Sequence, residues 1–260
     1  MFFWLYDYPN EVMAGIITGT FVAFYWIGCI LIRPILRLFA RTRGSNEIVG
    51  YILSCFGVFY GLLVGLIAVA AYQNYTQVET TVQKEATALT ALFYDVSAYP
   101  DPFGQNLRWL LRDYNRYVIK YAWPLQRKGI IPKGGIARVN AFQQKLLEFE
   151  PKTKGEEIIH AEALHQFNVF LEYRTQRLQS VTTNIPAVMW YVVIVGAMVN
   201  LAFVWLLDMK FLTQLILGGL LAFFLGTMIS LIVALDNPFR GDLSIGTDAF
   251  QNVAQIMMEE

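Results

Sequence analysis

The apolar residues of this chain gather in four long runs, which polar and charged segments separate. A helix needs about 20 apolar residues to cross the hydrocarbon core of a bilayer, and each run reaches that length. The runs cover residues 12–32, 48–72, 186–207 and 211–235. The pattern therefore predicts an all-α membrane protein with four transmembrane helices in two pairs.

A polar segment, residues 73–185, separates the two pairs and contains no apolar run long enough to cross a membrane. Its apolar residues recur at helical spacing, as at Val78, Val82 and Leu89. This spacing predicts that the second transmembrane helix continues beyond the membrane as one long helix. We expect a large helical extramembrane insert between the second and third transmembrane helices.

The insert is predicted to contain three further helices. Asp101 followed by Pro102 is typical of a helix start, and we expect that helix to end before Pro124. Apolar positions around Phe142 predict an amphipathic helix, and residues 155–185 a long one. The sequence thus predicts four parts. They are transmembrane helices 1 and 2 (residues 1–72), the helical extramembrane domain (73–185), transmembrane helices 3 and 4 (186–235), and a C-terminal polar turn and tail (236–260).

Composition supports a membrane location and argues against several classes of function. Hydrophobic residues make up 56% of the chain, which is more than an ordinary soluble domain contains. The 20 basic and 20 acidic residues balance, so no basic excess favours a nucleic-acid partner. Cys29 and Cys55 both lie in apolar runs and are interpreted as small hydrophobic side chains.

Local charge gives a prediction of topology. Four arginines occupy the short segment between the first two spans: Arg33, Arg37, Arg41 and Arg43. Basic residues in short loops favour the cytoplasmic side of a membrane. This rule places the loop in the cytoplasm and the large insert on the opposite side.

The sequence offers no constellation for catalysis. It contains no glycine-rich phosphate loop, no zinc-protease motif and no serine-nucleophile motif. His160 and His165 are five residues apart, on different faces of a helix, which argues against a shared metal. The spans also lack an ionisable residue near their centres, which disfavours an ion-coupled transporter but allows a passive pore. We expect no enzyme activity, cofactor or metal site.

The second span carries two different faces. Gly57, Gly61 and Gly65 repeat every four residues and form a small-residue ridge suited to close helix packing. The opposite face is bulky and apolar, and its members are Ile52, Phe56, Phe59 and Leu63, with Phe56 at the border. That face fits either contact with lipid or a hydrophobic constriction that gates a pore. Periodicity alone leaves both interpretations open.

Four bases recur every four residues in the insert: Arg108, Arg112, Arg116 and Lys120. They are interpreted either as a solvated helix face or as the lining of a vestibule in an oligomeric pore. In the second case they would raise the local concentration of anions.

The last apolar run ends in the stretch "DNPFRGDLSI", which resembles the segment that follows the last transmembrane helix of bestrophins. The matching residues are Asp236, Pro238, Phe239, Gly241, Asp242 and Leu243. The stretch "GLLVGLIAVAAYQNYTQV" is also similar to the bestrophin helix that lines the pore. The whole chain resembles the bacterial bestrophin-like proteins. It lacks the Arg-Trp-Trp that follows the pore helix and the acid-rich calcium clasp of the animal bestrophins.

The resemblance implies a homopentameric channel that conducts small inorganic ions passively, with chloride favoured over cations. It implies a pore neck on the second span, a basic vestibule, and a C-terminal turn docked on the extramembrane helices. It also implies a multi-pass protein of a bacterial inner membrane, with the lipid bilayer and copies of itself as partners. The family places the insert in the cytoplasm, against the arginine count. The alternative is a non-conducting, membrane-anchored sensor or scaffold whose helical domain binds a partner.

Overall fold

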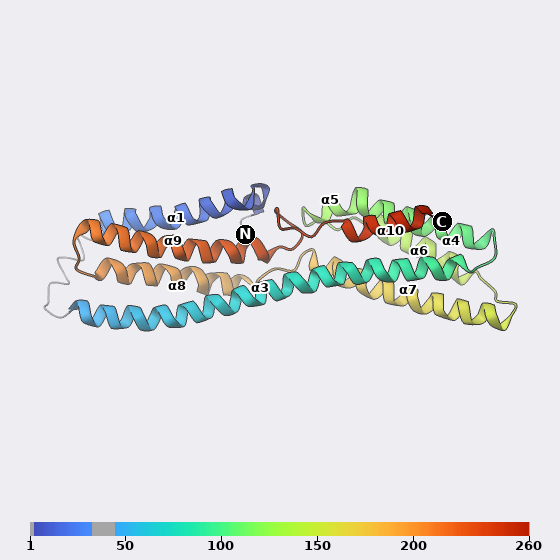
Figure 1. The fold of residues 1–260 in the computed structure, drawn as a ribbon, viewed down its shortest axis with the longest axis horizontal. Coiled ribbons are helices and arrows are strands. Elements are labelled where there is room, and N and C mark those ends of the chain that lie inside the picture. Colours follow the sequence, from blue (N-terminus) through green and yellow to red (C-terminus); the bar gives the residue numbers. More distant parts are fainter. Residues whose placement is uncertain (1–2, 33–44, 260) are drawn as a thin grey trace. The chain divides into compact units, whose positions relative to one another are not determined.

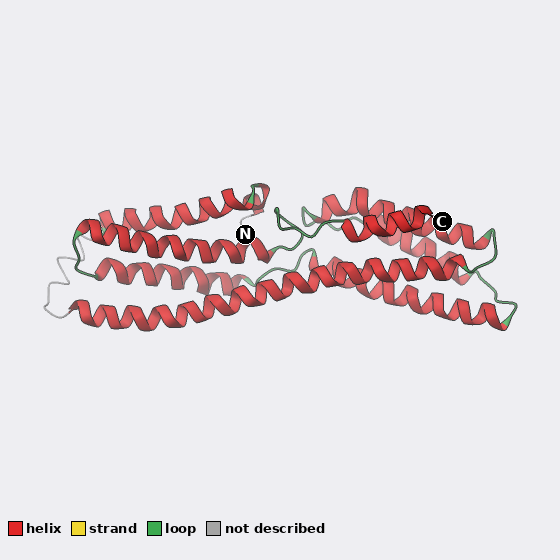
Figure 2. Ribbon diagram, viewed as in Figure 1, coloured by secondary structure: helices red, strands yellow, loops and turns green. Residues whose placement is uncertain are grey.

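The structure is a computed structural model that describes residues 3–32 and 45–259. Within these residues the regular structure is entirely helical (Figures 1 and 2). The elements are η1 (Phe3–Asp7), α1 (Asn10–Leu31), α3 (Ser45–Ser97), α4 (Phe103–Tyr117), η2 (Val118–Ala122), α5 (Trp123–Gln126), α6 (Gly134–Leu147), α7 (Lys154–Ser180), α8 (Ala187–Leu206), α9 (Phe211–Asp236) and α10 (Asp248–Glu259). The arginine-rich segment of the topology prediction lies outside the described residues.

Four of these helices, α1, α3, α8 and α9, are long and apolar enough to cross a membrane. Each corresponds to one of the runs predicted from the sequence, with α1 and α8 ending within one or two residues of the predicted limits. Helix α3 also continues well past its apolar part to Ser97, as the spacing of apolar residues predicted. The described residues form two compact units. Unit 1 comprises residues 1–74, 184–237 and 241–243, and unit 2 comprises 75–183, 238–240 and 244–260.

Unit 1 is built on close contact between α1 and α9. The ring of Tyr25 is completely buried, and its hydroxyl donates a hydrogen bond to the Gln214 carbonyl at 3.0 Å. Gly218 gives this ring its space, because an added Cβ would lie 1.9 Å from it. Gly226 allows an equally close approach, because a Cβ there would lie 2.7 Å from the Thr18 backbone. Small residues on α9 thus let two helices pack backbone to backbone.

Unit 2 is a helical bundle around an aromatic and aliphatic core. Leu89, Phe93, Phe167 and Phe250 are fully buried there, and they come from α3, α7 and α10. Helix α7 begins with a capping box, in which Thr153 and Glu156 satisfy each other's backbone N–H groups.

The predicted limits of the helix after Pro102 were wrong at both ends. The helix begins at Phe103, and the Asp101 carboxylate accepts bonds from Gln105 and Arg108 instead of capping the backbone. The helical path also does not end before Pro124. It passes through the π-helical turn η2 and continues as α5. Proline lacks the N–H that a regular α-turn requires, and the wider π-turn before it accommodates the ring.

Candidate functional site

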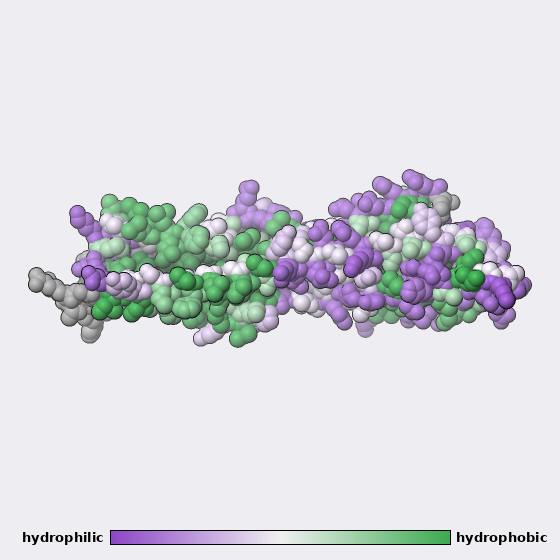
Figure 3. Space-filling model, turned by 60° about the horizontal axis from the view of Figure 1, so that its bottom comes forward, coloured by the Kyte–Doolittle hydropathy of each residue, from purple (hydrophilic) through white to green (hydrophobic). Residues whose placement is uncertain are grey.

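The apolar part of α3 is the least enclosed of the four membrane-length helices. Only 11% of its most apolar window is buried within the chain, against 50% for α9. Tyr60 and Val64 are buried in the core of unit 1, and the partly buried Leu53, Leu63 and Ile67 pack against the same core. Large apolar side chains on the remaining faces are exposed, which contributes to the hydrophobic surface in Figure 3. Lipid or another chain must cover this surface in a membrane protein.

The four predicted neck residues do not share one environment. Ile52, Phe56 and Phe59 are exposed, and Phe59 is the most accessible at 67%. Phe56 is partly covered by Phe203, with ring centroids 5.5 Å apart. Leu63 is partly buried and packs against the core of unit 1. Phe59 is therefore the predicted neck residue that is most available to a pore.

The predicted glycine ridge of α3 is not used for packing inside the described part of the chain. A Cβ added at Gly61 or Gly65 would meet no atom within 4 Å, and one at Gly57 would meet only the Asn200 side-chain oxygen at 3.9 Å. The ridge therefore remains open for contact with a neighbouring chain or with lipid. Close contacts are made instead by glycines on the other membrane-length helices: Gly28 on α1, Gly196 on α8, and Gly218 and Gly226 on α9.

The predicted basic stripe divides into two fixed and two free residues. Arg108 forms an ion pair with Asp101 at 3.3 Å, and Arg112 donates to the Met257 carbonyl at 2.7 Å. Arg116 and Lys120 are exposed, and neither forms an ion pair with another described residue. Two charges of the stripe are thus available to attract anions.

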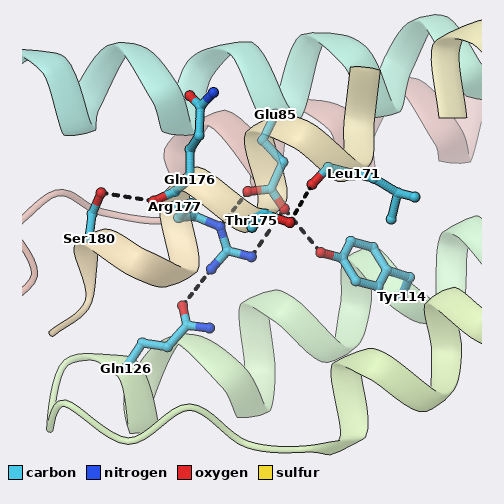
Figure 4. Close-up of polar contacts among 8 residues, drawn as sticks. All are labelled: Glu85, Tyr114, Gln126, Leu171, Thr175, Gln176, Arg177 and Ser180. Atoms are coloured by element: carbon cyan, nitrogen blue, oxygen red, sulfur yellow. Dashed lines mark hydrogen bonds and ion pairs between the residues drawn. The ribbon is translucent and has the colours of Figure 1, made fainter. Parts of the chain in front are cut away.

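A buried ion pair lies inside unit 2 (Figure 4). The Arg177 Nε donates to Glu85 Oε2 at 2.5 Å, and its Nη2 donates to Oε1 at 3.0 Å. Gln126 accepts from Nη1 at 2.6 Å, and the Tyr114 hydroxyl donates to the carboxylate at 3.0 Å. The side chains of the pair are 0–1% exposed. Two parallel bonds and two neutral partners offset the cost of removing both charges from water.

The pair perturbs the groups around it. Burial alone would lower the pKa of Arg177, but the charge of Glu85 outweighs it, so the pKa lies above its ordinary value. Burial, and then the negative charge of Glu85, raise the pKa of Tyr114. Both side chains therefore keep one protonation state across the physiological range, and the network acts as a permanent structural element.

Trp123 joins this network to the C-terminal segment within unit 2. Its ring lies 5.3 Å from the Arg177 guanidinium and packs edge-on against Phe239, 5.5 Å away. Its Nε1 donates to the Ile245 carbonyl at 3.2 Å. The Ile245 N–H in turn donates to the Pro238 carbonyl at 2.8 Å. The predicted Pro-Phe element of the C-terminal turn is thus buried on the helices of this unit.

The remaining turn residues belong to unit 1. The Asp242 carboxylate accepts from the Asn10 backbone N–H at 3.0 Å, at the first residue of α1. Asp236 accepts from the Ile185 N–H at 2.6 Å. Gly241 has a φ of +77°, a conformation that favours glycine. Each of the two carboxylates therefore accepts a backbone hydrogen bond within unit 1.

The two histidines have different surroundings. His160 Nδ1 lies 2.7 Å from the Tyr99 hydroxyl, and burial lowers the pKa of His160. His165 is exposed. Among residues 3–32 and 45–259, no group of three or more His, Cys, Asp or Glu side chains is arranged to hold a metal ion.

Sequence reasoning missed the buried network, although a local signal existed. Glu85 lies on the same buried helical stripe as Val82 and Leu89, and it is the only charged residue on that buried stripe of α3. Arg177 likewise continues the buried stripe that contains Phe170. An acid and a base that each interrupt a buried stripe are candidates for a buried pair.

Comparisons with known proteins agree with this architecture. A model of the bestrophin-like domain matches residues 19–250. Two solved variants of a bacterial bestrophin homologue from Klebsiella pneumoniae are 11% identical, with TM-scores of 0.67 and 0.66. The matches cover 94% and 92% of this chain, and 97% and 98% of theirs. A further structure of a bestrophin homologue from this organism is 12% identical, with a TM-score of 0.62 over 90% of this chain and 97% of its own.

At this level of identity the structural likeness establishes the fold. A search of curated proteins gives no match. The domain match covers most of the chain, and the fold agrees with the solved bacterial homologues. The chain belongs to the bestrophin-like family.

Proposed function

We propose that this chain forms a homopentameric channel for the passive conduction of small ions, without enzyme activity. The observation that carries the proposal is the exposure of α3, which is apolar and only 11% buried in its most apolar window. A helix that contacts its own chain along one face can contact neighbouring subunits and a pore with the others. Membership of the bestrophin-like family supports this arrangement.

In this proposal the membrane helices come as two pairs along the chain, α1 followed by the first part of α3, and α8 followed by α9, while in space α1 packs chiefly on α9. The helical domain of residues 73–185 stands outside the bilayer, and the C-terminal turn and tail follow from residue 236. The glycine ridge of α3 faces a neighbouring subunit. The location is the inner membrane of a bacterium, and the partners are the bilayer, small inorganic ions and other copies of the chain.

The proposed neck is the bulky face of α3. Phe59 is its central residue, because it is the most exposed of the predicted set. Phe56 and Ile52 extend the same face, and Leu63 supports it from the core side. A narrow ring of such side chains excludes water and so closes the path to ions without any charged gate.

We further propose that the channel favours anions such as chloride over cations. The support is the pair of exposed bases without ion-pair partners, Arg116 and Lys120. Repeated around a symmetry axis, they would create a positive potential in a vestibule and raise the local anion concentration. Replacement of both bases by glutamine should move the reversal potential toward that of sodium under separate chloride and sodium gradients.

The test is single-channel current from purified protein in liposomes. Phe59→Ala should widen the neck and raise the leak or the open probability. Leu220→Ala is the control, because Leu220 on α9 is 61% exposed and belongs neither to the proposed neck nor to the glycine ridge. Leu220→Ala should leave the current unchanged.

Two results would count against the channel. One is a wild-type protein that stays silent and remains silent with Phe59→Ala, which favours a membrane-anchored scaffold whose helical domain binds a partner. The other is an equal effect of both substitutions, which indicates lost packing instead of an altered constriction. Native mass measured on the same preparation checks the pentamer.

A further inference from the structure

A groove of about 280 Å³ lies in unit 2, where α10 packs beside α4 and η2. Its walls combine side chains of two chemical kinds. Three bases, Arg112, Arg116 and Lys120, line it together with apolar side chains from η2 and α10. A role as vestibule lining accounts for the exposed bases, but it does not account for the apolar side chains that line the same groove.

The bases are held by different means. The Nε of Arg112 donates to the Met257 carbonyl at 2.7 Å, and its guanidinium lies 5.2 Å from the Phe93 ring. This fixes one positive group at the wall at little further entropic cost. Arg116 and Lys120 lie exposed on the same wall without ion-pair partners among the described residues. The groove thus presents several donors to an anion, and none of its described lining residues is an acid.

The apolar lining comes from Ile119 on η2 and from Ala254, Met257 and Met258 on α10. Met258 is 75% exposed, so a large apolar side chain stands at the groove without cover. Methionine adapts its shape to varied apolar partners and is over-used at binding surfaces. The wall also includes a π-helical turn, a local geometry that is frequent at functional sites.

We propose that this groove binds a soluble aliphatic carboxylate of medium chain length. The bases recognise the carboxylate, and the apolar side chains cover the alkyl chain. At about 30 Å³ per water-sized group, the volume fits roughly nine non-hydrogen atoms. Heptanoate has that size, whereas an inorganic anion would leave the apolar lining bare. The proposal does not rest on conduction, because it needs only unit 2 of one chain.

The experiment is calorimetric titration of the full chain in phosphatidylcholine nanodiscs with heptanoate, 1-heptanol and heptylammonium. Saturable binding of heptanoate at one site per chain is expected, with much weaker binding of the alcohol and the cation. Methyl NMR of ¹³C-methionine protein, assigned with Met258→Leu, should show a shift of the Met258 signal during the titration.

Three variants locate the site. Arg116→Gln with Lys120→Gln should weaken heptanoate binding about tenfold or more. Ala254→Phe should abolish it by filling the groove without a change of charge. Lys128→Gln with Lys154→Gln removes two exposed bases outside the groove and should leave the affinity unchanged. The proposal is overturned if wild-type protein binds no heptanoate, if 1-heptanol binds equally well, or if the groove variants retain wild-type affinity.

Discussion

Replacement of Glu85 by glutamine removes one charge from the buried pair of unit 2 and keeps the shape of the side chain. Arg177, whose side chain is only 1% exposed, would then be a buried cation with neutral partners only. Breaking such a pair on one side costs about 3–5 kcal/mol. The Tyr114 hydroxyl can still donate to the amide oxygen, so little of this cost comes from Tyr114. We expect Glu85→Gln to destabilise unit 2 by about 3 kcal/mol or more.

Hydrogen exchange of the full chain in nanodiscs measures this change locally. An opening free energy lowered by 3 kcal/mol increases exchange of protected amides by about 150-fold. The amides to follow are those of α7 near Phe170 and of α3 near Leu89. Asp113→Asn is the matched control, because the Arg138–Asp113 pair is about one-third exposed on both sides. It should cost about 1 kcal/mol at most.

A double-mutant cycle separates the charge from the packing. Arg177→Met should also cost about 3–5 kcal/mol, because it leaves Glu85 as an unpaired buried anion. The double variant contains neither charge and should cost at least about 2 kcal/mol less than the sum of the single variants. It still leaves Gln126 without its donor, at about 1–3 kcal/mol. If Glu85→Gln speeds exchange no more than Asp113→Asn, or if the two changes simply add, the account of the buried pair is wrong.

Two further predictions concern unit 2. Because burial lowers the pKa of His160 in the folded chain, the unfolded chain binds more protons between that value and about 6.5. Stability should therefore fall as pH is lowered through this window, and thermal unfolding should show a pH dependence that His160→Gln removes and His165→Gln keeps. Phe239→Ala removes a side chain that is 2% exposed and should lower the free energy of unfolding by about 3–5 kcal/mol, measured by hydrogen exchange of the α10 amides. Leu243→Ala, at a position that is 46% exposed, should lower it by less than about 1 kcal/mol.

The helices could be predicted from the sequence because their signals are local. A run of about 20 apolar residues is sufficient to indicate a membrane helix. The spacing of Val82 and Leu89 is sufficient to continue α3 into water. Pro124 misled the prediction because a π-turn relieved the clash that normally ends a helix there. That relief depends on how the helix packs in the bundle, which local spacing does not encode.

The buried pair shows where local reasoning stops. Glu85 and Arg177 each interrupt an apolar stripe, and that interruption can be detected in the sequence. Their pairing joins positions 92 residues apart and depends on how α3 and α7 meet. Gln126 and Tyr114 complete the network from two other helical segments. The sequence therefore could indicate that each charge needs a partner, but the fold selects which one.

The glycines of α3 and α9 show the same limit within a membrane. Both helices are apolar almost all around, so hydrophobicity does not indicate which face packs. Small residues do mark packing faces, and Gly218 and Gly226 on α9 meet the aromatic ring and backbone of α1 at distances that exclude any larger side chain. Gly61 and Gly65 lie four residues apart on one face of α3, but a Cβ added at either would have no neighbour within 4 Å. A ridge with this geometry on the most exposed span is explained if its partner is another chain. Substitution of Gly61 by a larger residue should then weaken association of the subunits more than it lowers the stability of a single subunit.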